Sequence, residues 1–130
     1  MIHGALGPFP GCVQMSQGSK IFSGDAAILK DGESPTVPCY SIDRLPSWLR
    51  SQIDAIFLDV EGYELCVLQG GARTIAVNKP LILVEELPSL MQRYGVGEGE
   101  IAIWLASRGY RAVQRLDRDV IYVARGEARG

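Results

Sequence analysis

An apolar segment of strand length that runs directly into a group of acids constrains this chain more than any other feature. Residues Ile53–Val60 form a near-continuous apolar run, interrupted by Asp54, and the acidic stretch at residues 59–64 follows. Leu81–Glu85 is a second run of the same kind. Such runs are typical of parallel strands that are buried on both faces. We therefore expect both segments to be buried, parallel strands of an α/β sheet.

The other strands that the sequence predicts are shorter or more polar than these two. They are expected at Thr36–Tyr40, Tyr110–Leu116 and Val120–Arg125. Pro38 favours an edge position for the first, because proline cannot donate a ladder hydrogen bond. The last two are separated by three polar residues and are expected to form an antiparallel pair. The fold class we predict is thus α/β, with a mostly parallel sheet and an antiparallel C-terminal strand pair.

Helical segments alternate with these strands. Ser41 is placed to cap a short helical stretch that extends to Leu49. Further helices are expected at Tyr63–Gln69, Arg73–Val77, around Leu90–Tyr94 and at Glu100–Arg108. In the last of these, Ile101, Trp104 and Leu105 share one face and are assigned to the core. Tyr63, Tyr94 and Trp48 are candidates for lining a binding pocket.

The chain divides by composition into three parts. Residues 1–35 are rich in glycine and small polar residues, and are expected to be irregular apart from short apolar pieces at Cys12–Met15 and Ile21–Phe22. Residues 36–125 carry the regular pattern and form the main domain. Residues 126–130 are expected to be a frayed tail.

Charge, cysteine and histidine content exclude several classes of function. Thirteen basic and fifteen acidic residues give a net charge of −2, so no basic surplus drives binding to nucleic acid or to an anionic membrane. No apolar run reaches the roughly 20 residues of a membrane span, and no signal peptide is expected at the N-terminus. The three cysteines lack zinc-site spacing, and His3 is the one histidine. We expect a cytoplasmic protein without histidine-based catalysis, and the sequence leaves a metal requirement unknown.

The candidate site residues are acids at the ends of the two apolar strands. Asp59, Glu61 and Glu64 follow the first strand, and Glu85 ends the second. Ligands of open α/β sheets bind outside the carboxyl ends of the strands, and carboxylates gathered there repel one another, so that at least one has a raised proton affinity. A carboxylate in that state suits a general base or a cation ligand. Gly62 permits a tight turn between strand and helix. Glu64 is equally well explained as an acid favoured by the helix dipole.

Three blocks of sequence together resemble the FkbM-type methyltransferases. They are Asp59-Val60-Glu61-Gly62-Tyr63-Glu64, the segment Val67–Ala72, and Lys79–Glu86, supported by Ser41–Leu45 and by Gly109-Tyr110. The first block is fairly specific, whereas each of the others is weak by itself. The resemblance covers residues 36–125 and corresponds to the C-terminal portion of that family's domain.

This resemblance implies a partial class I, Rossmann-like methyltransferase sheet and S-adenosylmethionine as cofactor. The implied reaction moves a methyl group to a hydroxyl of a sugar, lipid or secondary-metabolite acceptor. We assign Asp59, Glu61 and Glu85 as candidate catalytic residues, with Asp59 and Gly62 as candidate cofactor contacts. Asp59, aided by Glu61 or Glu85, would act as the base or as a metal anchor.

The family's cofactor-binding first half has no counterpart ahead of residue 36. No strand, glycine loop and helix occur there in succession. Without that neighbour, Ala55–Val60 would be an exposed apolar edge with no lysine or proline to discourage pairing, so we expect self-association through it.

Two alternatives to a complete linear methyltransferase remain open. In a permuted methyltransferase, Gly95, Gly97 and Gly99 would form the glycine loop and Asp117 would bind the ribose, although no strand is expected before Gly95. In the second alternative, the chain is a non-catalytic fragment or interaction module. Binding of S-adenosylmethionine would separate this second alternative from the enzyme.

Overall fold

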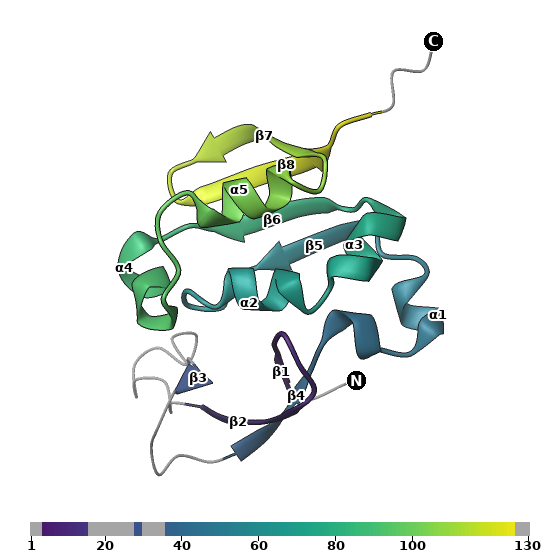
Figure 1. Ribbon diagram of the computed structural model, residues 1–130, viewed down its shortest axis with the longest axis vertical. Coiled ribbons are helices and arrows are strands. Elements are labelled where there is room, and N and C mark those ends of the chain that lie inside the picture. Colours follow the sequence, from purple (N-terminus) through teal and green to yellow (C-terminus); the bar gives the residue numbers. More distant parts are fainter. Residues whose placement is uncertain (1–3, 16–27, 30–35, 127–130) are drawn as a thin grey trace.

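The computed structural model describes residues 4–15, 28–29 and 36–126 and contains two four-stranded sheets. The C-terminal sheet has the order β5-β6-β8-β7, and the N-terminal sheet has the order β1-β4-β2-β3. Figure 1 shows the C-terminal sheet and its helices above the N-terminal strands. The chain is α/β, and both of its sheets are mixed.

The C-terminal sheet contains one parallel and two antiparallel strand pairs. Its strands are β5 (Ala55–Leu58), β6 (Leu81–Glu85), β7 (Tyr110–Leu116) and β8 (Asp119–Ala124). β5 and β6 are parallel, whereas β8 is antiparallel to both β6 and β7. The antiparallel strand pair at the C-terminus is therefore confirmed, and the parallel character is confined to β5 and β6.

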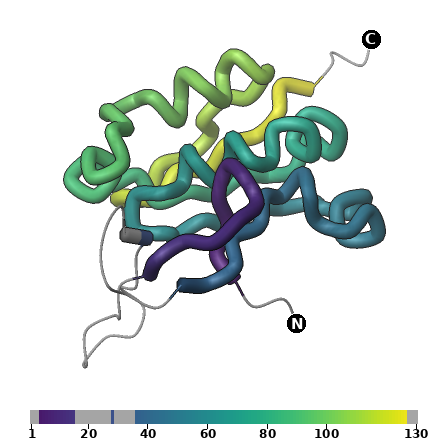
Figure 2. The backbone as a smooth tube through the Cα atoms, turned by 60° about the horizontal axis from the view of Figure 1, so that its bottom comes forward, coloured from purple at the N-terminus to yellow at the C-terminus, as the bar shows by residue number. Residues whose placement is uncertain are grey.

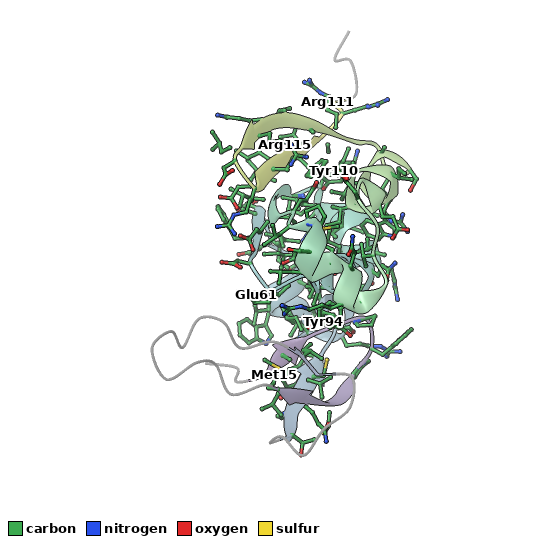
Figure 3. All side chains as sticks on the ribbon, turned by 90° about the vertical axis from the view of Figure 1, so that its left-hand side faces the viewer. Met15, Glu61, Tyr94, Tyr110, Arg111 and Arg115 are labelled. Atoms are coloured by element: carbon green, nitrogen blue, oxygen red, sulfur yellow. The ribbon has the colours of Figure 1, made fainter. Side chains whose placement is uncertain are left out.

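The helices of the described residues cover only one face of this sheet. The helices are α2 (Glu64–Gln69), α3 (Ala72–Asn78), α4 (Pro88–Met91) and α5 (Glu100–Ala106), with a 3₁₀ turn η3 (Gln92–Tyr94) after α4. Alternate strand residues, including Ile56, Leu58 and Ile82, point toward the helices and are buried with Leu68 and Leu105. Figure 3 shows the strands on one side of the molecule and the helices on the other.

The opposite face of the sheet is open in the described part of the chain. Phe57 is 69% exposed, Leu81 is also exposed, and Leu83 is only partly buried. The expectation that the first apolar strand is buried on both faces is therefore wrong. β5 is an apolar strand with one covered face, because the chain from β5 to β8 places every helix on the same side.

The N-terminal sheet is built from short strands that lie before, between and after two undescribed segments, residues 16–27 and 30–35. They are β1 (Ala5–Leu6), β2 (Gly11–Met15), β3 (Ile28–Leu29) and β4 (Thr36–Tyr40). The expected apolar piece at Cys12–Met15 lies within β2, whereas Ile21–Phe22 and residues 127–130 are outside the described residues. β4 lies between β1 and β2, so the expected edge position is wrong. Pro38 is tolerated because β1 pairs only with Cys39 and Tyr40.

Two short helical segments join the sheets. They are η2 (Ile42–Arg44) and α1 (Ser47–Arg50). Ser41 precedes η2, but its side chain makes no capping hydrogen bond. Instead, the carboxylate of Asp43 accepts hydrogen bonds from the backbone N–H groups of Arg73 and Thr74, at 3.0 and 2.8 Å, and from the Thr74 hydroxyl at 2.7 Å. This carboxylate fastens the connection to the start of α3.

The connection between β1 and β2 lies against the end of α2. Gly7 approaches Gly70 so closely that a Cβ on Gly70 would lie 2.1 Å from the Gly7 carbonyl oxygen. Figure 2 shows this first part of the chain, in purple, crossing in front of the teal segments. β5 pairs only with β6 among the described strands, so it is one of the two edge strands of its sheet, and its edge position is as expected.

Candidate functional site

Asp59 and Glu85 lie side by side at the carboxyl ends of the two parallel strands. Leu58 pairs with Val84 in the register of β5 and β6, and the two acids are the next residues along each strand. Asp59 lies two residues after exposed Phe57, and Glu85 lies two residues after partly buried Leu83. Because every second residue of a strand faces the same side, both acids face the open side of the sheet. The structure thus brings together the two acids that the sequence places at the ends of separate strands.

The carboxylate of Glu85 is held in an environment of mixed charge. Its Oε1 atom is 3.4 Å from the Nη1 atom of Arg118, and its backbone pairs with Asp119 of β8. Partial burial and the negative charge of Asp59 raise the pKa of Glu85, and Arg118 opposes the rise. Proximity to Asp59 therefore favours the protonated form of Glu85, as expected for acids that share an edge.

The turn after Asp59 has a left-handed backbone. Glu61 has φ of 56° and Gly62 has φ of 96°, and the first of these is unfavourable for a residue with a side chain. A Cβ on Gly62 would lie 2.5 Å from the carbonyl group of Leu90. Close packing against the end of α4 therefore accounts for this glycine, and its contact with a cofactor stays a prediction.

Glu64 fixes this turn from inside the protein, a role that the sequence did not indicate. Its side chain is 1% exposed, and its Oε1 atom accepts hydrogen bonds from the N–H groups of Val60, at 3.0 Å, and Gly62, at 3.3 Å. Its Oε2 atom is buried and has no hydrogen-bond partner among the described residues. Burial raises the pKa of Glu64, the two amide hydrogen bonds oppose the rise, and Asp59 adds to it. The signal for this role that the sequence offers is the position of Glu64, which follows the glycine turn at the start of an apolar helix.

Two cavities lie at the junction between the sheets, and Tyr63 lines both of them. One, of about 270 Å³, is bordered by Asp59, Val60 and Tyr63 from the C-terminal part and by β1, Met15 and Ile28 from the N-terminal part. The other, of about 500 Å³, is lined by Cys12, Val13, Gln14, Ile28, Tyr63, Cys66 and Tyr94. Figure 3 shows Glu61 and Tyr94 close to this junction, with Met15 below them. Asp59 therefore borders a hollow, and two of the expected pocket aromatics line its neighbour.

The two tryptophans, the pocket candidate Trp48 and the core candidate Trp104, lie elsewhere. Trp48 is 73% exposed on α1 and lines neither of these cavities. Trp104 packs against the core while the guanidinium of Arg108 lies 3.6 Å from its ring centre. The core assignment of Trp104 is thus confirmed, with one side of the ring covered by a cation instead of by the sheet.

Glu86, next to Glu85, has a structural role. It accepts a short hydrogen bond from the Tyr122 hydroxyl and forms an ion pair with Arg115 at 3.1 Å. These contacts fasten the β7–β8 hairpin to the end of β6 and leave Glu85 as the acid that faces Asp59. Within residues 4–15, 28–29 and 36–126, no group of three acids, cysteines or histidines has an arrangement that could hold a metal ion.

The residues before Gly95 do not support a permuted glycine loop. They form α4 and η3, and Gly95 ends η3 with φ of 73°. A glycine loop that binds a dinucleotide follows a buried strand, which directs its backbone amides toward the phosphates. Gly95, Gly97 and Gly99 here connect two helical segments, so this arrangement lacks the strand that the permuted alternative requires.

Acids at the carboxyl ends of adjacent parallel strands, in a mixed sheet with helices, define an α/β protein compatible with a methyltransferase-like fold. Comparison with family models identifies a match to the methyltransferase FkbM domain over residues 7–112. The chain belongs to the FkbM methyltransferase family. The match begins well before residue 36, so β2 falls within the family domain, whereas β1 lies just before the matched range. Comparisons with curated proteins and with solved structures gave no significant match.

No helix in the described ranges combines the length and the apolar character that crossing a bilayer requires. The longest helices, α3 and α5, have seven residues each.

Proposed function

We propose that this protein takes part in S-adenosylmethionine-dependent O-methyl transfer to a hydroxyl group. The observation that carries this proposal is the placement of Asp59 beside Glu85 on the open face of the sheet, at the border of a cavity. Membership of a methyltransferase family supports the reaction class. The acceptor class that we favour is a small molecule, a glycan or a lipid that carries an alcohol or a phenol.

The chain's own residues would act on the acceptor side of this reaction. A hydroxyl oxygen becomes a better nucleophile as its proton is withdrawn, and the carboxylate of Asp59 is the group placed to accept that proton. Arg118, which pairs with Glu85 at 3.4 Å, would offset part of the negative charge around Asp59. Alignment of the acceptor in the cavity would supply the largest part of the rate. When bound, S-adenosylmethionine supplies a methyl group on a positively charged sulfur.

The described residues fit only one side of a site for this cofactor. Asp59 and Gly62 stand at a strand end, where such a molecule binds in α/β sheets. No glycine loop between a buried strand and a helix occurs among the described residues to hold its remaining portion. We therefore restrict the mechanism to proton acceptance and positioning by this chain.

The experiment combines binding and turnover on the full chain. Calorimetry with S-adenosylmethionine is expected to give micromolar affinity, and formation of S-adenosylhomocysteine is measured with methyl glucoside, monoolein and 2-naphthol as acceptors. Asp59→Asn should lower turnover more than it raises the KM for the acceptor. Asp119→Asn, which changes the neighbouring acid of β8, is the matched control and should leave turnover within about twofold. Unchanged turnover in Asp59→Asn would remove Asp59 from the chemistry.

A non-catalytic interaction module is the second candidate, and the open edge of β5 favours it. Phe57 is exposed on a strand that, among the strands the structure describes, has a partner on one side only. We infer that a second copy of the chain, or a longer relative, pairs along this edge. Absence of S-adenosylmethionine binding together with concentration-dependent association would support the module over the enzyme.

A further inference from the structure

We propose that the 500 Å³ cavity between β2 and α2 binds a neutral aromatic ring, and that this ring belongs to the hydroxyl-bearing acceptor of the reaction proposed above. The proposal rests on the proposed function for the role of the ring, but not for its binding. The ligand class is inferred from the walls of the cavity, which are two tyrosine rings, two aliphatic side chains, two thiols and the uncharged amide of Gln14.

The two tyrosines form one preorganised aromatic wall. The ring centres of Tyr63 and Tyr94 are 4.8 Å apart with an interplanar angle of 66°, an edge-to-face arrangement. The Tyr94 hydroxyl donates a 2.7 Å hydrogen bond to the carbonyl oxygen of Ile28, and the Tyr63 hydroxyl hydrogen-bonds with the Cys66 thiol. Both rings are therefore fixed in place, and a third ring can pack on them with little loss of side-chain freedom.

The cavity favours an uncharged ligand. None of the described lining residues carries a formal charge. Burial raises the pKa of Tyr63 to about 12 and also raises that of Tyr94, so both phenols stay neutral at physiological pH. A phosphate or carboxylate would lose its hydration there without meeting a cation from the described residues. The volume lies within the range of sites that bind small organic molecules.

The position of the cavity connects the ring to the proposed base. Tyr63 and Ile28 line both this cavity and the smaller one that Asp59 borders. A ring seated against Tyr94 can therefore direct a hydroxyl group past Tyr63 toward the Asp59 carboxylate. An aromatic alcohol or a phenol meets this requirement better than a sugar, which presents hydroxyl groups on every side and has no aromatic face.

Binding of 2-naphthol to the full chain tests the proposal. The expected result is saturable binding by calorimetry, weakened about tenfold by Tyr94→Ala and changed less than threefold by Tyr94→Phe, which keeps the ring. Trp48→Ala, on the exposed surface of α1, is the matched control and should bind as the wild type does. Methyl glucoside should show no binding at the same concentration.

Alkylation of the cysteines supplies a second measurement that does not depend on activity. Cys12 is exposed and Cys66 is partly buried in the cavity wall, whereas Cys39 is buried. Saturating 2-naphthol should slow iodoacetamide labelling of Cys12 and Cys66 at least threefold, with Cys39 as the unreactive reference. Failure to bind 2-naphthol, or equal binding by Tyr94→Ala, overturns the proposal. Binding of 2-naphthol without any S-adenosylmethionine-dependent methylation leaves the aromatic site standing and counts against the methyltransferase function.

Discussion

The two sheets of this protein differ in what their side chains do. The C-terminal sheet and its helices supply nearly all of the buried apolar side chains, among them Leu68, Ile82 and Leu105. The N-terminal sheet contributes the buried residue Cys39 and the partly buried Leu6, while its strands β1, β2 and β3 line the cavities beside Tyr63. One region therefore stabilises the fold, and the other closes the hollow in which a ligand would lie.

Truncating a core residue should show this difference most strongly. Leu68 on α2 is 0% exposed, and Leu68→Ala should lower the free energy of unfolding by about 2–5 kcal/mol because it removes apolar contacts and leaves a cavity. Val13→Ala, in the half-buried wall of β2, should cost about 1 kcal/mol or less. Urea unfolding followed by circular dichroism measures both values. Equal losses would show that the two sheets share one core.

Glu64 tests whether the turn between β5 and α2 depends on a buried acid. Glu64→Leu leaves the N–H groups of Val60 and Gly62 without an acceptor and should cost about 1–3 kcal/mol. Glu64→Gln keeps an acceptor oxygen and should cost less. The decisive readout is the position of the Val60 and Gly62 amide resonances, which should move in the leucine variant and stay close to wild type in the glutamine variant.

The raised pKa of Glu64 also predicts a pH dependence. In the folded protein this acid keeps its proton to higher pH than in the unfolded chain, where the ordinary value is 4.5. The stability it contributes is therefore fully present below about pH 4.5 and declines as the pH rises toward the folded-state pKa. Glu64→Gln should abolish this decline. The pKa of Glu85 is also raised, so its contribution to stability declines in the same direction of pH. The pH dependence of Glu85→Gln is therefore measured as well.

Asp43 joins the two regions, and its removal should have an intermediate effect. Asp43→Ala deprives three donors on α3 of their acceptor, and the expected cost is about 1–2 kcal/mol. Burial alone would raise the pKa of Asp43, but the hydrogen bonds from Arg73 and Thr74 outweigh it and lower the pKa below 3.8. This stabilisation is present above pH 3.8 and is lost as the pH falls through the folded-state pKa. Acid unfolding of wild type against Asp43→Asn measures it, and identical acid transitions would contradict the assignment.

Sequence patterns predicted the C-terminal sheet well because its signals are local. The alternation of apolar runs, glycines and amphipathic helices located β6 at Leu81–Glu85 and the β7–β8 pair, and the strand ends brought Asp59 and Glu85 together. Burial of β5 on both faces was predicted wrongly because an apolar run does not show how many helix layers exist. Pro38 fits in an interior strand because β1 pairs only with Cys39 and Tyr40, and β1 lies more than thirty residues away in the sequence. The role of Glu64 depends on which acid the turn directs inward, and a single sequence does not specify that choice.

The smallest expected change in stability concerns the open face of the C-terminal sheet. Phe57→Lys replaces an exposed side chain on the edge strand β5, so the free energy of unfolding should change by about 0.5 kcal/mol or less. A lysine on an edge strand discourages pairing with another chain, so the variant should stay monomeric where the wild type associates. Val77→Lys, at a position of α3 that is 80% exposed, is the matched control and should associate as the wild type does. Sedimentation velocity over a range of concentrations measures the difference. A wild type that is monomeric throughout would mean that the open face alone does not drive association, and equal loss of association in both variants would locate the contact away from β5.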